Sequence, residues 1–431
     1  MLWRVLACVV IFSAGASVVT AGLEEMEHIV IFMQENRAFD HYFGTLKGVR
    51  GFNDRTPIQL RSGLDAFHQP IDQNDLSQYM LPFRTEANRT NAMCMPAPEM
   101  NYPTDMKIWN HGRHDSWNTA RDGGYGMGYF TREDLPYYYA LYDQYAVGDQ
   151  YFQSTFTATN PNRMHLFTGS NGLSVGQSPV LDNTEPRPGY TWETLGEILE
   201  MKNVSWRVYQ QLDNFDDNAF AWFKNYQQAR PGDNLFDKGL DRQLSLMQAF
   251  EQDLHADNLP QVSFIIAPTR KSEHATNHPC AGEDFSARLL KILFAHPRIY
   301  RKTALLLMYD EGGQFFDHHW SPTPPLDGKG GFSSVPVQGE VNTDIGTTSV
   351  PAPIGLGFRV PLIVVSPWTR GNIVNRYVGS CMGMGYVYWV VPILIPISII
   401  IYNHTHTYIP SFPYTYIIRT HALVKSSTTP R

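Results

Sequence analysis

Cysteine is scarce in this chain, with 4 residues among 431. A dense disulfide framework of the kind that stabilises small secreted scaffolds is therefore excluded. Cys8 lies in the N-terminal leader described below, which leaves Cys94, Cys280 and Cys381. An odd number leaves one thiol over in a secreted chain, and we expect Cys94 and Cys280 to form the disulfide.

A basic excess is also missing. The 34 lysines and arginines are outnumbered by 41 acids, so the formal net charge is −7. A chain of this balance is not expected to bind nucleic acid. Its length and its 43% of hydrophobic residues allow one large core, so we predict one catalytic domain with insertions.

The N-terminal apolar run, Val5 to Phe12, is too short to span a bilayer. Arg4 before it and Val19-Thr20-Ala21 after it are typical of a signal peptide and its cleavage site. We therefore predict a signal peptide over residues 1–21 and secretion of the mature chain. Two glycosylation sequons agree with that route, and they begin at Asn88 and Asn203.

Short apolar runs alternate with longer segments whose apolar residues recur at helical spacing. The runs that predict buried strands are His28–Met33, Trp206–Tyr209, Val262–Ile266, Ala304–Tyr309 and Leu362–Val365. The segments that predict helices are Thr191–Glu200, Gln243–His255 and Glu283–Ala295. This alternation favours an α/β fold with parallel strand pairs. Polar stretches rich in proline and glycine predict long surface loops over Phe67–Tyr102 and Trp320–Ala352.

The character of the chain changes at Arg376. Tyr386 to Tyr402 is almost wholly apolar, but Pro392 and Pro396 interrupt it and make a membrane helix a poor interpretation. We predict that the catalytic domain covers residues 22–375. We interpret residues 376–431 as the product of a mis-predicted gene model, such as translated intron, which sequencing of the transcript would test.

Two of the predicted strands are followed directly by acids and amides. Gln34-Glu35-Asn36-Arg37 follows the first strand, and Asp310-Glu311-Gly312-Gly313 follows the fourth. In open α/β sheets, ligands bind beyond the carboxyl ends of the strands. Oxygen-rich side chains gathered there suit a hard divalent cation. For either segment alone the capping of a following helix is the better explanation, whereas the two together make metal binding an equal alternative.

A third segment, Thr157-Ala158-Thr159-Asn160-Pro161-Asn162-Arg163, presents a hydroxyl on a rigid turn, because Pro161 and the amides fix its backbone. Threonine is a weak nucleophile unless a metal or a base lowers the pKa of its hydroxyl. The sequence leaves two functions open for Arg163, namely bidentate binding of a phosphate oxygen and clamping of the loop to an acid.

These segments occur in one order together with further motifs. The motifs are Glu35-Asn36-Arg37 with Phe39-Asp40-His41-Tyr42-Phe43-Gly44, then Thr159-Asn160-Pro161-Asn162-Arg163, then Tyr309-Asp310-Glu311-Gly312-Gly313 with Phe316-Asp317-His318. The chain resembles the phosphoesterase family of phosphatidylcholine-type phospholipases C and related acid phosphatases, most closely its fungal branch, over Glu27 to Val374. The resemblance implies an alkaline-phosphatase-like α/β fold, with a central mixed, largely parallel sheet flanked by helices and long loop insertions. The resemblance therefore implies that residues 22–375 form a phosphoesterase domain.

The resemblance also implies functions for individual residues. One divalent metal ion, whose identity the sequence does not fix, would be bound by Glu35, Asn36, Thr159, Asp310 and Glu311. Thr159 would be the nucleophile, and Asn36 would contact the phosphoryl group. His274, in Ser272-Glu273-His274, would be a general acid or electrostatic stabiliser, for which an imidazole is suited. His278 would line the pocket.

The chain departs from the family pattern in two motifs, one of which is an Asp-His-Thr-Ser motif that relatives carry beyond the position of Val374. Many relatives carry Asp-x-x-His, whereas the matching stretch here is Asp105-Met106-Lys107-Ile108. His111 or His114 would substitute for the missing histidine, although a solvated loop position is the more frequent one for such residues. Glu273-His274-x-x-x-His278 invites a zinc-protease interpretation, but the acid precedes the first histidine and Pro279 disfavours a helix across both.

The expected function is that of a secreted, metal-dependent phospholipase C. It would cleave phospholipid phosphodiesters through a phosphothreonine intermediate, with transient contact to a membrane surface. Two alternatives stay open at this point. One is a broad-specificity acid phosphatase that acts on small phosphomonoesters with the same nucleophile. The other is a non-catalytic or truncated pseudoenzyme, which the unusual tail and the missing histidine would favour.

Overall fold

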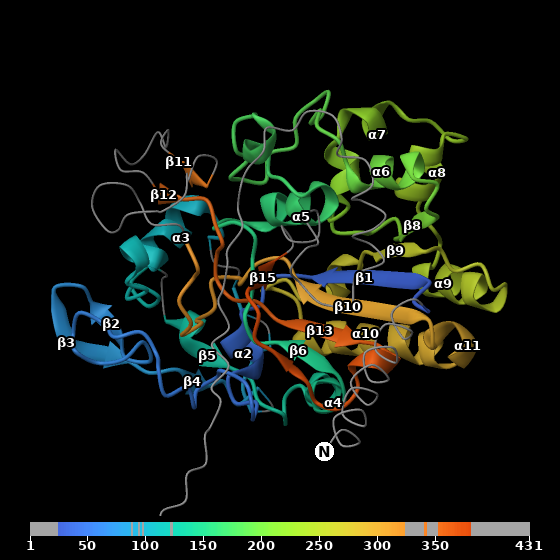
Figure 1. The fold of residues 1–431 in the computed structure, drawn as a ribbon. Coiled ribbons are helices and arrows are strands. Elements are labelled where there is room, and N and C mark those ends of the chain that lie inside the picture. Colours follow the sequence, from blue (N-terminus) through green and yellow to red (C-terminus); the bar gives the residue numbers. More distant parts are fainter. Residues whose placement is uncertain are drawn as a thin grey trace, which may run out of the picture.

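The computed structural model describes residues 25–87, 89–93, 95–96, 99–120, 124–323, 340–342 and 352–380. The predicted signal peptide, the sequon at Asn88, most of the loop at 320–352 and the tail beyond residue 380 lie outside them. A seven-stranded sheet forms the centre of the molecule (Figure 1). From edge to edge its strands are β14 (Val374–Asn375), β6 (Ala146–Gly148), β13 (Leu362–Val365), β10 (Thr303–Tyr309), β1 (His28–Gln34), β9 (Val262–Ile265) and β8 (Trp206–Tyr209).

The sheet is mixed and largely parallel, as predicted. β1 pairs in parallel with β10 and with β9, β9 with β8, and β6 with β14. β13 alone runs antiparallel to its neighbours, β10 and β6. All five predicted strands are confirmed to within one residue at each end. They form because continuous apolar runs suit strands that are covered on both faces.

Helices cover both faces of this sheet. Successive side chains of a strand point to opposite faces. Phe264 of β9 meets Phe167 of α5 (Thr159–Thr168), with ring centroids 5.1 Å apart. Phe32 of β1 is in register with the next residue of β9, and it meets Phe285 of α10 (Pro279–Phe294) at 5.4 Å. α5 and α10 therefore lie on opposite faces, as Figure 1 shows.

The remaining elements of the described ranges surround this core. The helices are α2 (Phe39–Phe43), α3 (Tyr102–Trp109), α4 (Pro136–Gln144), α6 (Leu195–Met201), α7 (Lys224–Gln228), α8 (Asn234–Gly239), α9 (Leu246–His255) and α11 (Pro297–Tyr300). Two-stranded pairs are formed by β2 (Gln69–Asp72) with β3 (Asp75–Met80), β4 (Phe83–Arg84) with β5 (Gly128–Tyr129), β7 (Tyr151–Phe152) with β15 (Gly379–Ser380), and β11 (Val341–Asn342) with β12 (Ala352–Pro353). The three predicted helices correspond to α6, α9 and α10.

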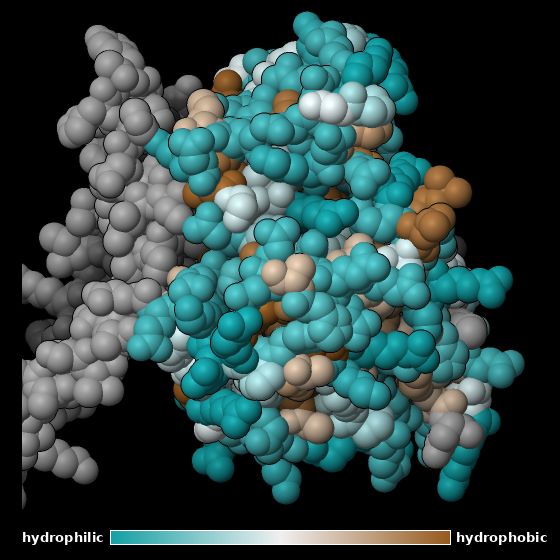
Figure 2. All heavy atoms as spheres, turned by 90° about the vertical axis from the view of Figure 1, so that its right-hand side faces the viewer, coloured by the Kyte–Doolittle hydropathy of each residue, from teal (hydrophilic) through white to brown (hydrophobic). Residues whose placement is uncertain are grey.

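The insertion predicted at 67–102 is not wholly a loop, because it contains the β2–β3 hairpin, which projects at the left of Figure 1. Asp72 and Asp75 close the hairpin around a tight turn. No helix in the described ranges is both long and apolar enough to cross a membrane. The face shown in Figure 2 is mostly hydrophilic, with apolar residues scattered over it.

The described residues bear on two further expectations, the disulfide of Cys280 and the boundary of the C-terminal tail. Cys280 is a free cysteine, so the predicted disulfide is not formed there, and its expected partner Cys94 lies outside the described residues. The first residues of the predicted foreign tail pack on the domain, since β15 pairs with β7 and Arg376 Nη2 donates to the carbonyl of Gly48 at 3.0 Å. The predicted domain boundaries stay a prediction.

Candidate active site

Four neighbouring parallel strands end at one edge of the sheet, and a candidate site residue follows each of them. Glu35 comes directly after β1 and Asp310 directly after β10. Because Gln34 is in register with Tyr309, these two acids leave the sheet side by side. The segments after β9 and β8 bring His274 and Asp217 to the same edge. The residues predicted from the strand ends therefore gather at one edge of the sheet.

The predicted ligands after β1 and β10 lie together and are almost completely buried, with at most 2% of each side chain exposed. The backbone N–H of Asn36 donates to Asp310 Oδ1 at 2.9 Å, and its Nδ2 donates to Glu311 Oε1. Asn36 has φ +54°, a left-handed conformation that asparagine tolerates better than most residues. This turn directs its side chain back towards the acids that follow β10.

Thr159 is the first residue of α5 and is half-buried, so it is more accessible than the acids beside it. Its Oγ1 donates to Glu35 Oε2 at 3.3 Å. The preceding loop is fixed by Asn162, whose Oδ1 accepts from Thr155 N at 2.9 Å and whose Nδ2 donates to Thr157 O at 3.0 Å. The N-terminus of a helix carries partial positive charge, which favours a bound anion such as a phosphoryl group.

Arg163 is completely buried, one helical turn further along α5. Its Nε donates to Glu35 Oε1 at 2.9 Å, and its Nη2 lies 3.1 Å from Asp217 Oδ2. Its Nε also lies 3.6 Å from Asp310 Oδ2. Of the two functions left open for Arg163, this geometry matches the clamp to acids, and its contact with phosphate stays a prediction.

Asp217 was missed by the sequence argument. It is 3% exposed and joins the cluster through Arg163. The signal in the sequence was a run of acids and amides, Asn214-Phe215-Asp216-Asp217-Asn218, downstream of the second predicted strand, Trp206–Tyr209. We name the group of Glu35, Asn36, Asp217, Asp310, Glu311, Thr159 and Arg163 the acid cluster.

The acid cluster holds more negative than positive charge. Burial raises the pKa of Asp217 and Asp310 well above the usual range, although Arg163 opposes it, and the charge of Glu35 raises both further. Burial and the neighbouring Asp310 raise the pKa of Glu311 as well. Burial also acts to raise the pKa of Glu35, but Arg163 and its acidic neighbours outweigh burial and lower it. Three of the four acids thus share the single guanidinium of Arg163, and Glu311 lies beside them without a contact to it.

A metal ion fits the acid cluster. Asn36 Oδ1 and Asp310 Oδ2 are buried and have no hydrogen-bond partner among the described residues. Buried polar atoms of this kind call for a partner. Carboxylate, amide and hydroxyl oxygens form the donor set that hard divalent cations prefer. Glu35, Asn36, Thr159, Asp310 and Glu311 would therefore hold the ion, which would also balance the excess negative charge.

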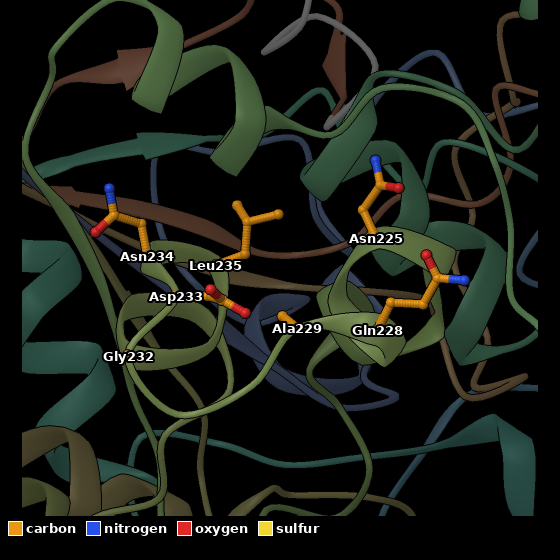
Figure 3. A pocket seen from close by; sticks show the side chains of 7 residues that line it. All are labelled: Asn225, Gln228, Ala229, Gly232, Asp233, Asn234 and Leu235. Atoms are coloured by element: carbon orange, nitrogen blue, oxygen red, sulfur yellow. The ribbon is translucent and has the colours of Figure 1, made fainter.

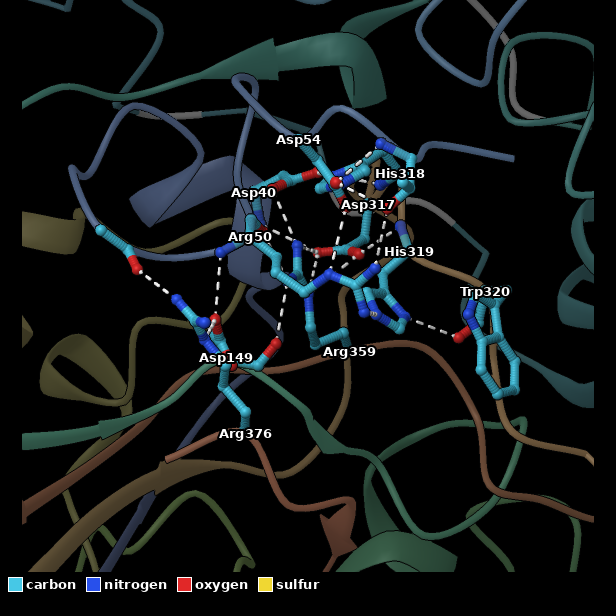
Figure 4. A network of polar contacts seen from close by, with 12 residues as sticks. Asp40, Arg50, Asp54, Asp149, Asp317, His318, His319, Trp320, Arg359 and Arg376 are labelled. Carbon is cyan, nitrogen blue, oxygen red and sulfur yellow. Dashed lines mark hydrogen bonds and ion pairs between the residues drawn. The ribbon is translucent and has the colours of Figure 1, made fainter. Parts of the chain in front are cut away.

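A second buried group could also hold a metal ion, which fits a metal-dependent phosphoesterase. Asp40, Asp317 and His318 offer ligand atoms within 4.8 Å of one another. Arg359 already pairs with both acids, since its Nη2 lies 2.9 Å from Asp40 Oδ1 and 3.1 Å from Asp317 Oδ2 (Figure 4). Burial lowers the pKa of His318, but Asp40 outweighs it and raises the pKa. Charge in this group is therefore balanced by the protein itself.

The two predicted histidines lie on the loop between β9 and α10. His274 is half-buried, its ring packs 5.3 Å from that of Phe215, and it interacts electrostatically with Glu35. Burial lowers the pKa of His274, while the charge of Glu35 opposes this. His278 is exposed and precedes the first turn of α10. Its pKa is lowered by burial and by Arg37, and its function as a pocket residue stays a prediction.

The substitutes considered for the missing histidine lie in different surroundings. His111 is exposed, as expected of a loop histidine, whereas His114 is 1% exposed, so the solvated position expected for it is wrong. His114 Nε2 accepts from Ser321 N at 3.4 Å. Asp105 is held by Gln153 and Gln314, each at 3.3 Å, and burial raises its pKa to about 7.

A surface depression of about 510 Å³ lies at α7 and α8 (Figure 3). Its lining residues are Asn225, Gln228, Ala229, Gly232, Asp233, Asn234 and Leu235. None of them belongs to the acid cluster. The depression carries no titratable pair or nucleophile, so we assign it no chemistry.

The sequence profile of the phosphoesterase family matches residues 26–407. This chain belongs to the phosphoesterase family. Among its relatives in that family, a non-hemolytic phospholipase C of Burkholderia pseudomallei is 38% identical over 82% of this chain and 53% of its own length. A non-hemolytic phospholipase C of Pseudomonas aeruginosa is 38% identical over 83% and 52%. Phospholipase C B of Mycobacterium tuberculosis is 35% identical over 83% and 72%.

The chain spans about half the length of the first two of these family members. Among solved structures, a protein of the alkaline phosphatase superfamily from Vibrio parahaemolyticus aligns over 58% of each chain, with 14% identity and a TM-score of 0.30.

Proposed function

We propose that this phosphoesterase is a secreted, metal-dependent phospholipase C that cleaves phospholipid phosphodiesters through Thr159. One observation carries the proposal. The hydroxyl of Thr159 lies 3.3 Å from Glu35 Oε2, at a helix N-terminus and beside a cluster of acids with excess negative charge. The relatives named phospholipase C support a phospholipid substrate, although this chain covers only part of their length.

We place the catalytic metal ion in the acid cluster rather than at Asp40, Asp317 and His318. Arg359 compensates the acids of the second group, whereas Asn36 Oδ1 and Asp310 Oδ2 in the first have no hydrogen-bond partner among the described residues. The second group also lacks a nucleophilic hydroxyl among its three members. A bound divalent ion supplies charge that lowers the pKa of the Thr159 hydroxyl and stabilises the phosphoryl oxygens.

In the first displacement, Thr159 Oγ1 forms a bond to phosphorus and the bond from phosphorus to the diacylglycerol oxygen breaks. The proton of the Thr159 hydroxyl is released to solvent as Oγ1 attacks. Glu35, which accepts the hydrogen bond of the hydroxyl before the attack, holds Oγ1 in place. The N-terminus of α5 and the amide of Asn36 stabilise the phosphoryl group. His274 gives a proton to the leaving alkoxide. The product is diacylglycerol, and the phosphorylated headgroup stays on Thr159.

In the second displacement, water attacks phosphorus and the bond from phosphorus to Oγ1 breaks. His274, now neutral, takes a proton from the water, and the departing threonine oxygen takes a proton from solvent, which replaces the one released in the first displacement. The phosphorylated headgroup leaves, and both residues return to their starting state. Arg163 takes part by holding Glu35 and Asp217 in position through the whole cycle.

Transient contact with a membrane and secretion belong to the proposal. Leu212 and Leu244 expose 80% and 102% of their surface. Their loops are in contact, since Arg242 Nη1, two residues before Leu244, donates to the carbonyl of Leu212 at 3.1 Å. Leu212 precedes Phe215, whose ring packs on His274, by three residues. An apolar tip near the site suits a substrate drawn from a lipid surface. The sequon residue Asn203 is exposed, which supports glycosylation on the secretory route.

The experiment compares Thr159→Ala and Thr159→Ser with the parent on phosphatidylcholine and on p-nitrophenyl phosphate. We expect phosphocholine release by the parent and a loss of about a thousandfold in Thr159→Ala, because the residue acts as nucleophile. Thr159→Ser keeps the hydroxyl and should retain measurable activity. Acid quenching of the parent should trap phosphate on the peptide that contains Thr159.

Thr168→Ala is the matched control, because Thr168 lies at the other end of the same helix. It should keep the parental activity. Equal activity of Thr159→Ala and the parent would refute the nucleophile. Orthophosphate release from the aryl monoester without phosphocholine release would replace the phospholipase C with an acid phosphatase.

A further inference from the structure

Glu273 is a fully buried acid that none of the steps above uses. It lies between Ser272 and His274, in the loop that joins the 3-10 helix η5 (Thr269–Lys271) to α10. Its backbone has φ +68°, in the left-handed region that residues other than glycine rarely adopt. Such a conformation persists where the surroundings impose it, and it occurs often at functional sites.

Hydrogen bonds from the surrounding core hold the side chain of Glu273 in place. Glu273 Oε2 accepts hydrogen bonds from the hydroxyls of Tyr42 at 2.7 Å and Tyr309 at 3.0 Å. Its Oε1 accepts from Gln34 Nε2 at 3.0 Å and from the hydroxyl of Tyr138. These donors come from α2, β10, β1 and α4. The carboxylate is thus fixed to four elements of the core, with both oxygens occupied, as a buried carboxylate requires.

The main chain of the same loop is fixed by Arg37. Its Nε donates to the carbonyl of Glu273 at 2.8 Å, and its Nη2 donates to the carbonyls of His274 and Asn277, each at 3.2 Å. In addition, the backbone N–H of Glu35 donates to the carbonyl of Ser272 at 2.9 Å. The segment after β1 that supplies a predicted metal ligand therefore also fixes the loop that carries the proposed general acid.

The space around Glu273 is limited by α10. A Cβ added at Gly282 would lie 2.2 Å from Glu273 Cγ, which is closer than any real contact of that kind. α10 can approach the loop this closely only because residue 282 is glycine. The side chain of Glu273 therefore has one place in the core, and the following residue is left to face the acid cluster.

We propose that Glu273 is a positioning residue, whose carboxylate fixes the left-handed turn that directs the His274 imidazole at the reacting phosphoryl group. The inference rests on the proposed function, in which His274 protonates the leaving group. Glu273 itself does not touch the substrate. It acts through His274, whose ring lies against Phe215 and interacts with Glu35.

The test uses two phosphocholine esters that differ in the leaving group. Phosphatidylcholine releases an alkoxide, which needs a proton, whereas p-nitrophenyl phosphorylcholine releases a phenolate, which does not. In Glu273→Gln we expect the rate of the first displacement, measured as the pre-steady-state burst of the leaving group, to fall by about tenfold on phosphatidylcholine and by less than about threefold on the aryl ester. The second displacement, in which His274 acts on water, is the same for both esters and does not enter this comparison. His274→Ala should show the same pattern more strongly. The double variant should be no slower than His274→Ala, because the two residues act as one unit.

Glu283→Gln is the matched control. Like Glu273, Glu283 is a buried acid, and it lies on α10. Its Oε1 accepts from the backbone N–H groups of Tyr137 and Tyr138, at 2.8 and 3.0 Å, and not from the His274 loop. In Glu283→Gln, the ratio of the rates on the two esters should equal that of the parent. An equal loss on both esters in Glu273→Gln, or losses that multiply in the double variant, would overturn the inference.

Amide hydrogen exchange gives a second readout that needs no activity. The peptide spanning residues 272–278 should exchange about tenfold faster in Glu273→Gln than in the parent, and at the parental rate in Glu283→Gln. Unchanged exchange in Glu273→Gln would overturn the inference. A parent that hydrolyses neither ester would instead refute the proposed function, so the two failures are distinguishable.

Discussion

Asp217 Oδ2 lies 3.1 Å from Arg163 Nη2, so an acid downstream of β8 is tied to the helix that begins with Thr159. The same guanidinium contacts Glu35, which follows β1. Arg163 therefore links three separate segments of the chain at the edge of the sheet. The position of the proposed nucleophile depends on this link as much as on its own hydrogen bond.

Replacement of Asp217 by asparagine should weaken metal binding. The change removes one buried negative charge from the cluster and loosens Arg163 from its partner. We expect about tenfold weaker binding of Mn²⁺ to the metal-free protein, as is typical of residues that support metal ligands. Titration calorimetry with Mn²⁺ measures it. Asp253→Asn is the control, because Asp253 pairs with Arg207 away from the cluster, and equal affinity in both variants would contradict the prediction.

Chelation should destabilise the protein as well as inactivate it. Without the ion, the pKa values of Asp217, Asp310 and Glu311 lie well above their usual range, so these acids must either take up protons or hold buried charge that only Arg163 compensates. We expect EDTA to lower the melting temperature by roughly 5 °C, because an ion that binds only the folded state stabilises it. Scanning fluorimetry with Mg²⁺, Ca²⁺, Mn²⁺ and Zn²⁺ added back separately would identify the ion that restores both stability and activity. A melting temperature indifferent to all four would argue against the site.

Removal of Arg359 should destabilise the fold strongly. Arg359 is completely buried between Asp40 and Asp317, and its Nη1 also donates to the carbonyls of Arg50 and Asp149, at 2.6 and 3.0 Å (Figure 4). Arg359→Met removes the guanidinium that two buried acids share, which leaves Asp40 with His318 alone as a charged partner, and should cost about 3–5 kcal/mol in the free energy of unfolding.

Urea denaturation measures this loss. Arg132→Met is the control, since Arg132 makes an exposed pair with Asp143 and should cost only about 0–1 kcal/mol. Similar losses in the two variants would show that the Arg359 network does not carry the stability assigned to it.

His165 should make the stability depend on pH. It is buried in α5, neither of its ring nitrogens has a hydrogen-bond partner among the described residues, and burial lowers its pKa to about 4. Above pH 6.5 the histidine is neutral in both states, so it has no effect on stability there. As the pH falls from 6.5 to about 4, only the unfolded state takes up the proton, and stability is lost.

The expected loss from His165 is on the order of 3 kcal/mol over that interval, from about 1.4 kcal/mol per unit of pKa. Urea denaturation of the parent and of His165→Leu at several pH values between 4 and 7.5 measures it. The variant should lose less stability than the parent on acidification, and parallel curves would contradict the prediction.

The central strands could be predicted because β1, β10 and β13 are uninterrupted apolar runs, which follow directly from burial on both faces. β6 could not, since its three residues, Ala146-Val147-Gly148, have no pattern of their own and form a strand only because β13 and β14 lie beside them. The antiparallel direction of β13 likewise has no local pattern that specifies it.

In the site, too, some residues could be predicted from the sequence and others could not. Glu35 and Asp310 follow their strands directly, so the carboxyl-end rule brings them together. Asp217 lies eight residues beyond the end of β8, and only the fold of that loop returns it to the sheet edge. The function of Arg163 was also undecidable, because a buried clamp and a phosphate ligand require the same residue at the same place in the sequence.

The position of β1 in the sheet has a consequence for biosynthesis. Its two neighbours begin at residues 262 and 303, so the strand that leaves the ribosome first among the seven finds no partner until residues 35 to 261 have followed it. Contacts of such long sequence separation form slowly. An apolar strand without its neighbours can pair with the wrong segment or with another chain. We therefore expect the nascent chain to depend on chaperones until β9 has been synthesised.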